Sequence, residues 1–242
     1  MHLFERDETM RILFCNIAWM EYYKGIVPGK DEPKGGGSYV KINNDAHEKY
    51  NFDPVYLSKE AGYPEGEYCL GFVETKSTNG RTSNQLNLEK IDGCGAYKDK
   101  TELDNVLVVY CALYPDAIEK ETYVVGWYKH ATIYRNYEVI RFPSEIEGEY
   151  YDQAYNAIAK KENCVLLPRH LRRKANKWRV PRKTKGVAFG FGQANVWFAQ
   201  GSIDNRHLKE FLDKIVRQIE EYDGENWVDK QMLFTQVSKG MK

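Results

Sequence analysis

The stretch from Lys160 to Lys185 holds the densest set of chemically active side chains in this sequence. It carries eleven Lys and Arg residues against one acidic residue, Glu162, whereas the whole chain balances 35 basic with 35 acidic residues. A local excess of one sign creates a positive face even when the total charge is zero. Phosphate groups are the natural counter-charge for such a face, because their neutralisation releases counterions.

We therefore predict that this basic tract contacts a nucleic-acid backbone. Trp178 stands among the cations and offers a flat ring for stacking on a base. The alternative is a solvated charged loop whose cations pair with acidic neighbours. The predicted phosphate-binding residues are Arg169, Arg172, Arg173, Lys174, Lys177, Trp178, Arg179, Arg182 and Lys183.

Three further segments, residues 16–19, 125–131 and 193–197, each place a tryptophan beside small or polar residues at an expected strand or strand end. Tryptophan rings around a small pocket hold a flat or methylated base by stacking and by cation–π attraction. Amide side chains can bond to the edge of a flipped base. The alternative is that these rings fill the core of a β-rich protein. The predicted base pocket consists of Asn16, Trp19, Trp127, Tyr128, Gln193, Asn195 and Trp197.

Metal-dependent cleavage of nucleic acid is the alternative enzymatic chemistry. Asp53 followed by Glu74-Thr75-Lys76 fits the D…E-x-K spacing, in which two carboxylates hold Mg²⁺ and a lysine assists the attacking water. The pattern is short and recurs by chance in many strands. No His or Cys pair has the spacing of a metal site. We therefore favour a protein with no catalytic residues, no metal and no cofactor.

Composition indicates a globular protein of the cytoplasm. The 242 residues are 42% hydrophobic, which is enough to bury a real core, and no run of about 18 apolar residues predicts a membrane span. The first ten residues include Glu5, Asp7 and Glu8 and lack the apolar segment of a signal peptide. The five cysteines are widely spaced and odd in number, which favours free buried thiols in a reducing compartment.

Hydrophobic patterning predicts many short strands followed by a helical C-terminal part. Residues 43–67 and 77–100 are mostly loop, apart from a short strand over 86–91. The helix over 204–222 has its apolar side chains on one face, with Ser202 or Asp204 as its N-cap, and residues 150–162 also show helical spacing. The predicted strands are 11–20, 39–42, 68–76, 86–91, 105–113, 123–128, 131–135, 137–142, 164–167 and 194–199.

These elements predict an α+β fold, built as a small curved antiparallel sheet or barrel with flanking helices and a C-terminal helix. We expect a single domain over residues 1–242. A seam near 143–149 would separate a β-rich barrel part, 1–142, from a part over 150–242 that holds the basic tract, a strand and the C-terminal helix.

Four segments carry a resemblance to a known group of domains. They are RILFCNIAWMEYYKG, GGGSYVKINNDAHEKYNF, VVGWYKHATIYR and GQANVWFA. They resemble a domain of prokaryotic restriction and defence proteins that often precedes a nuclease module. The wider group is the PUA-like superfamily, which includes EVE and YTH domains. No separate effector domain is visible in this chain, so the resemblance implies a reader that acts alone or with a nuclease on another polypeptide.

The resemblance implies a compact β-barrel whose aromatic pocket holds a modified base in DNA or RNA. Joined to the basic tract, it yields our expectation of a reader of a flipped, modified base in antiviral defence. DNA is favoured over RNA as the partner, and no membrane is expected. An interaction subunit of a defence complex, with the basic tract on an acidic partner, is the third possibility.

Overall fold

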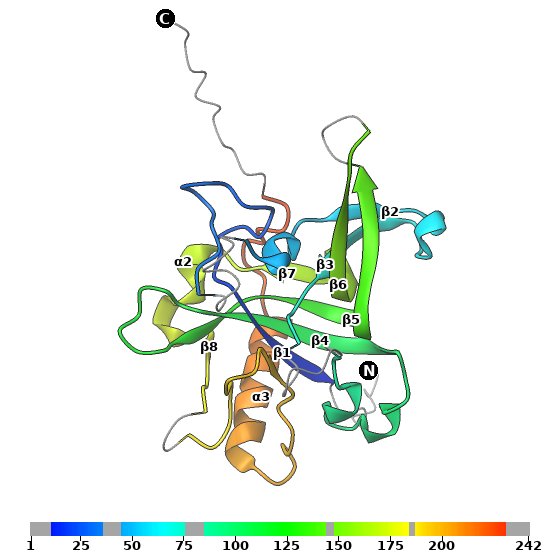
Figure 1. Ribbon diagram of the computed structural model, residues 1–242. Helices are drawn as coiled ribbons and strands as arrows, with labels where there is room; N and C mark the ends of the chain where they lie inside the picture. Colours follow the sequence, from blue (N-terminus) through cyan, green and yellow to red (C-terminus); the bar gives the residue numbers. More distant parts are fainter. Residues whose placement is uncertain (1–10, 36–44, 76–84, 144–147, 184–186, 231–242) are drawn as a thin grey trace, which may run out of the picture.

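The computed structural model describes residues 11–35, 45–75, 85–143, 148–183 and 187–230 (Figure 1). Nine strands of these residues form one sheet, and two α-helices and six short 3-10 helices accompany it. The strands are β1 Ile12–Ile17, β2 Val55–Leu57, β3 Gly66–Gly71, β4 Glu102–Leu113, β5 Thr122–Pro143, β6 Tyr150–Lys160, β7 Cys164–Leu166, β8 Arg179–Val180 and β9 Val196–Trp197. The α-helices are α2 Arg169–Arg172 and α3 Arg206–Glu220, and the 3-10 helices are η1 His47–Tyr50, η2 Lys59–Ala61, η3 Leu88–Lys90, η4 Gly95–Tyr97, η5 Lys161–Asn163 and η6 Lys174–Asn176.

The sheet is mixed and open. Its strand order is β2-β3-β6-β5-β4-β1-β9, with β7 and β8 paired to β5 off this path. β1 runs parallel to β4 from Ile12↔Leu107 to Ile17↔Ala112, and the other pairs are antiparallel. The α+β class is therefore confirmed, whereas the expected barrel is wrong. Within the described residues the end strands β2 and β9 do not pair, and without that pairing a sheet cannot close.

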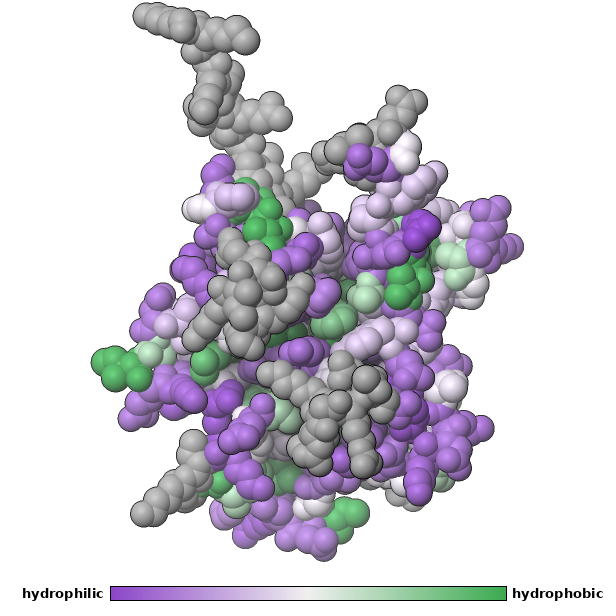
Figure 2. Space-filling model, in the orientation of Figure 1, coloured by the Kyte–Doolittle hydropathy of each residue, from purple (hydrophilic) through white to green (hydrophobic). Residues whose placement is uncertain are grey.

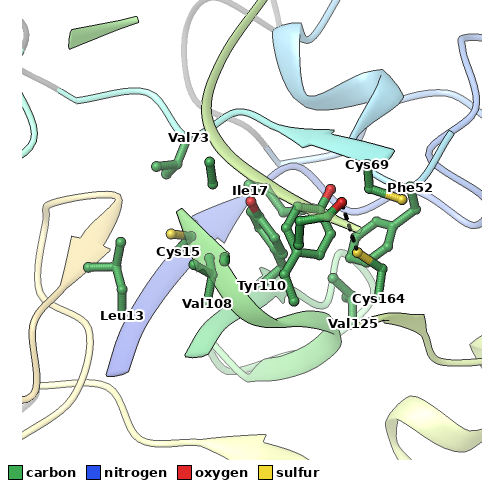
Figure 3. Packing of buried hydrophobic residues seen from close by; sticks show 14 of the residues in the cluster. Leu13, Cys15, Ile17, Phe52, Cys69, Val73, Val108, Tyr110, Val125 and Cys164 are labelled. Carbon is green, nitrogen blue, oxygen red and sulfur yellow. Dashed lines mark hydrogen bonds between the residues drawn. The ribbon is translucent and has the colours of Figure 1, made fainter. Parts of the chain in front are cut away.

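Side chains of β1 alternate between two cores on opposite faces of the sheet. Leu13, Cys15 and Ile17 join a large cluster that also takes Tyr110 of β4 and Cys164 of β7 (Figure 3). Ile12 and Phe14 face the second cluster, which α3 covers with Leu208, Ile215 and Ile219. All five cysteines are buried and free, as the sequence predicts.

α3 confirms the amphipathic helix predicted over 204–222. Its N-cap is Asn205, whose side chain accepts a hydrogen bond from the Leu208 amide at 3.0 Å, and not Ser202 or Asp204. Ser202 is engaged elsewhere, because its hydroxyl donates to Asp92 at 3.0 Å. No helix in the described part of the chain is long and apolar enough to cross a membrane.

Two other expectations about secondary structure are wrong, and a third holds except that its three separate strands are one. Residues 150–162 form β6 and η5 instead of a helix, because β6 is paired on both edges, with β5 and with β3. The segments 123–128, 131–135 and 137–142 are parts of the single long strand β5. The stretch 86–91 contains η3 in place of a strand. The strand expected over 39–42 lies outside the described residues.

β5 and β6, which flank residues 143–149, pair from Thr132↔Ile158 to Pro143↔Tyr150. Beyond the main sheet they continue as a two-stranded hairpin (Figure 1). The face of the molecule seen in Figure 2 is mostly hydrophilic, and its hydrophobic patches are small and separate.

Candidate nucleic-acid interface

The basic tract lies along one end of β5. β7 pairs with β5 at Trp127↔Val165, and β8 pairs with it at Thr122↔Val180. A side chain at Gly126 would collide with the Val165 carbonyl and with the Phe52 ring, so glycine is what lets β7 come this close. α2 and η6 connect the two short strands across the surface, and this anchoring decides which cations point outward.

Most cations of the tract are exposed to solvent, and some have acidic partners. Arg169 pairs with Glu21 at 3.2 Å, and Arg179 pairs with Glu121 at 3.5 Å. The half-buried Arg182 donates to the Thr122 hydroxyl at 2.9 Å. The exposed cations among the predicted phosphate-binding residues are Arg169, Arg173, Lys174, Lys177, Arg179 and Lys183. The surface of the tract is therefore positive, with two of its arginines already paired.

Arg172 is a structural residue and has no surface left for a phosphate. Its side chain is 0% exposed, and its guanidinium donates to three backbone carbonyls, those of Leu167 at 2.9 Å, Met20 at 2.6 Å and Glu21 at 2.6 Å. Burial lowers the pKa of this guanidinium, whereas the nearby Tyr23 and Asp31 act to raise it. The prediction that Arg172 binds phosphate is therefore corrected.

The ring of Trp178 is also buried. Its indole stacks on Trp127 with centroids 5.3 Å apart, and Tyr222 from the end of α3 meets Trp127 edge-on at 5.3 Å. Trp127 is 0% exposed and Trp178 2% exposed. These two tryptophans therefore form part of the second core, where no base can reach their faces.

The remaining residues of the predicted base pocket do not gather in one cavity. Tyr128 is fully buried and donates to the Asn51 carbonyl, and Trp197 stacks on Phe14 at 4.6 Å. Asn16 and Asn195 do meet, but through their main chains, since the Asn16 backbone N–H donates to the Asn195 backbone carbonyl at 2.6 Å. Gln193 is exposed on the loop before β9. Trp19 therefore lies apart from Trp127 and Trp197, because Trp127 belongs to the second core and Trp197 packs against it.

Trp19 does line a hollow, and this hollow opens onto the basic tract. It has a volume of about 450 Å³. Its walls come from the end of β1, the end of β4, α2 and the segment after α3. The lining residues are Trp19, Glu21, Tyr114, Arg169, His170, Arg173 and Trp227. The structure therefore places one predicted base-pocket residue and two predicted phosphate-binding residues in one site.

Sequence reasoning missed Tyr114 and Trp227 as parts of this site. Tyr114 directly follows β4, and its ring meets Trp19 edge-on at 5.2 Å. Trp227 lies in the last described segment, far from both along the chain. Their only sequence signal is that each is an aromatic residue just after an apolar or amphipathic element, which many core residues share.

Asn226 and Trp227 form a short segment after α3, called the strap here, whose hydrogen bonds to β7 hold Trp227 in place. The Asn226 side chain donates to the Cys164 carbonyl at 2.8 Å and accepts from the Leu166 amide at 3.0 Å. The Trp227 amide donates to the Leu166 carbonyl at 2.9 Å. The Trp227 indole stacks on the Tyr22 ring, with ring centroids 5.1 Å apart and an angle of 11° between the ring planes. The hollow is thus built from fixed walls.

The nuclease alternative gains no assembled site from the described residues. Glu74 accepts a hydrogen bond from Asn195 at 3.2 Å. Burial raises the pKa of Asp53, whereas the positive charge of the nearby Lys24 acts to lower it. Lys76 lies outside the described residues. Within the described part of the chain, no group of three His, Cys, Asp or Glu side chains is placed to hold a metal ion.

The chain was compared with protein-family models, with curated proteins and with solved structures. None of them matches it.

Proposed function

We propose that this protein binds a nucleic-acid strand through the hollow and the exposed cations beside it. The observation that carries the proposal is the hollow's lining, which joins the half-buried Tyr114 and the largely buried Trp19 and Trp227, 4% and 6% exposed, to two arginines of the basic tract. Phosphates and bases alternate along a strand at short intervals. A surface that places cations next to aromatic side chains therefore matches both parts of one nucleotide unit.

The exposed cations hold the backbone, and the hollow contacts a base. Such phosphate contacts set the position of the strand and carry little sequence information, so any selectivity lies in the hollow. The resemblance to base-reading domains of prokaryotic defence proteins supports a modified base as the feature that is read. It also supports DNA as the strand and a nuclease on another polypeptide as the effector.

The backbone part of the proposal predicts a salt-dependent affinity that rests on the tract. We expect the quadruple variant Lys174→Gln, Lys177→Gln, Arg179→Gln and Lys183→Gln to bind all sequences more weakly. Each lost phosphate contact should lower the slope of log affinity against log salt by about 0.7 for a single strand and about 0.9 for a duplex. Fluorescence anisotropy with labelled oligonucleotides across a salt series measures both effects.

A matched control removes four exposed cations elsewhere. Lys59→Gln, Lys98→Gln, Arg206→Gln and Lys214→Gln change the net charge equally, but none of the four belongs to the tract or lines the hollow. We expect this control to keep most of the affinity and the slope. Equal losses in the two quadruple variants would contradict a binding surface on the tract.

A second function, as a subunit that binds another protein, is favoured by the β5–β6 hairpin. Three apolar side chains on it are well exposed, with Val139 at 56%, Tyr150 at 65% and Tyr151 at 41%. Exposed apolar groups on a projecting element are typical of protein contacts. Failure of the native chain to shift any DNA or RNA at low salt would favour this function over the first.

A further inference from the structure

The aromatic walls of the hollow already have cations on their faces. The Arg173 guanidinium lies 3.8 Å from the Tyr114 centroid, and the Lys230 ammonium lies 3.8 Å from the Trp227 ring. The buried Arg172 guanidinium lies 5.3 Å from the Trp19 ring.

A ring face is the negative region that would attract a cationic ligand. Here the chain's own cations use these faces, and Arg169 adds a further positive charge at the rim. The hollow is therefore unsuited to a positively charged methylated base, and the arginines on its rim are suited to an anionic group such as the phosphate beside the bound base.

Among the described residues that line the hollow, Glu21 is the one carboxylate, and its main chain is held on both sides. The Glu21 carbonyl accepts from Arg172 at 2.6 Å, and the Glu21 amide donates to the Asp31 carboxylate at 2.6 Å. With its main chain fixed, the side chain reaches Arg169, where carboxylate and guanidinium are 3.2 Å apart. The position of this carboxylate is thus built into the site.

We infer that Glu21 is an electrostatic gate: it occupies the Arg169 guanidinium until a phosphate of the bound strand takes its place. This inference rests on the proposed function and adds how the hollow selects its ligand. The Arg169 side chain is 53% exposed and the Glu21 side chain 24% exposed, and a partly exposed ion pair is weak enough to exchange. A phosphate can accept two parallel hydrogen bonds from the Arg169 guanidinium. Arg173 on the same rim also attracts the phosphate, whereas Glu21 forms its ion pair with Arg169.

The gate predicts that removing its charge strengthens binding. We expect Glu21→Gln to bind a single-stranded 12-mer oligonucleotide about fivefold more tightly than the native chain, the size of a partly exposed ion pair. Glu162→Gln is the matched control, because it removes one negative charge inside the tract but outside the hollow. It should change the affinity by less than about twofold. Anisotropy titrations at one salt concentration measure all three proteins.

A second comparison separates a local gate from a general charge effect. In an Arg169→Gln background the phosphate loses the cation that Glu21 occupies, so adding Glu21→Gln should no longer give a gain. The Glu21 contacts with Arg172 and Asp31 use the main chain, so we expect the melting temperature of Glu21→Gln to stay near that of the native chain.

The outcomes separate the two levels of the proposal. If the native chain binds the oligonucleotide but Glu21→Gln gains no more than Glu162→Gln, the gate is wrong and nucleic-acid binding stands. If Glu21→Gln gains equally with and without Arg169, the gate is again wrong. If the native chain binds no oligonucleotide at low salt, both the gate and the proposed function are wrong.

Discussion

Replacing Arg172 by alanine should destabilise the protein by about 3–5 kcal/mol, the largest effect that we expect from any single cation. The substitution removes a fully buried guanidinium and leaves three backbone carbonyls without their donor. Each unpaired buried carbonyl costs about 1–3 kcal/mol, and the cavity adds to this cost. Urea unfolding followed by tryptophan fluorescence measures the change in the free energy of unfolding.

Lys174→Ala is the control for this experiment, because it removes a cation of the same tract from an exposed position. We expect it to change the free energy of unfolding by no more than about 0.5 kcal/mol. If Arg172→Ala were as stable as Lys174→Ala, the three hydrogen bonds would not hold the hollow's walls together.

The contrast between Arg172 and its neighbours shows what sequence reasoning about charge can supply. The local excess of cations is visible in the chain, and most of these side chains do lie on the surface. Burial of one arginine depends on carbonyls of residues 20 and 21, which are about 150 positions away. No local pattern distinguishes it from Arg173, which is exposed on the hollow's rim.

Secondary structure was predictable where the sequence pattern fitted only a strand or only a helix. β4 follows from its run of β-branched residues, and α3 follows from its apolar face. β6 did not, because Tyr151, Ala154, Tyr155 and Ile158 have helical spacing but belong to a strand with a neighbour on each edge. The pairing partners decide this case, and they lie in other parts of the chain.

The surroundings of the tryptophans likewise depend on distant parts of the chain. Trp19, Trp127 and Trp197 have similar neighbours in the sequence, yet they lie in different surroundings. Trp19 lines the hollow, whereas Trp127 and Trp197 belong to the cluster under α3. Tyr114 and Trp227 complete the hollow only because β4 and the strap after α3 end at the same place. The sequence therefore pointed to Trp19, Arg169 and Arg173, which line the hollow, but not to Tyr114 and Trp227, which complete it.

Trp127 offers the sharpest test of whether the base binds in the hollow or at the predicted pocket, because it was predicted to hold a base and is fully buried. We expect Trp127→Ala to cost about 3–5 kcal/mol, since it removes the ring that packs between Trp178 and Tyr222. Thermal melting measures this loss. Trp127→Phe should cost less, because the Trp127 indole nitrogen has no hydrogen-bond partner to lose.

The folded Trp127→Phe protein then separates a core ring from a binding ring. We expect it to bind oligonucleotides like the native chain, whereas Trp227→Ala should weaken binding because it removes a wall of the hollow. Both are measured by anisotropy at a temperature where circular dichroism shows each variant folded. Loss of base selectivity in folded Trp127→Phe, with Trp227→Ala unchanged, would place the base at Trp127 and contradict the hollow. Because Trp127 lies under α3 and the hollow lies at the ends of β1 and β4, the two outcomes assign base recognition to different parts of the sheet.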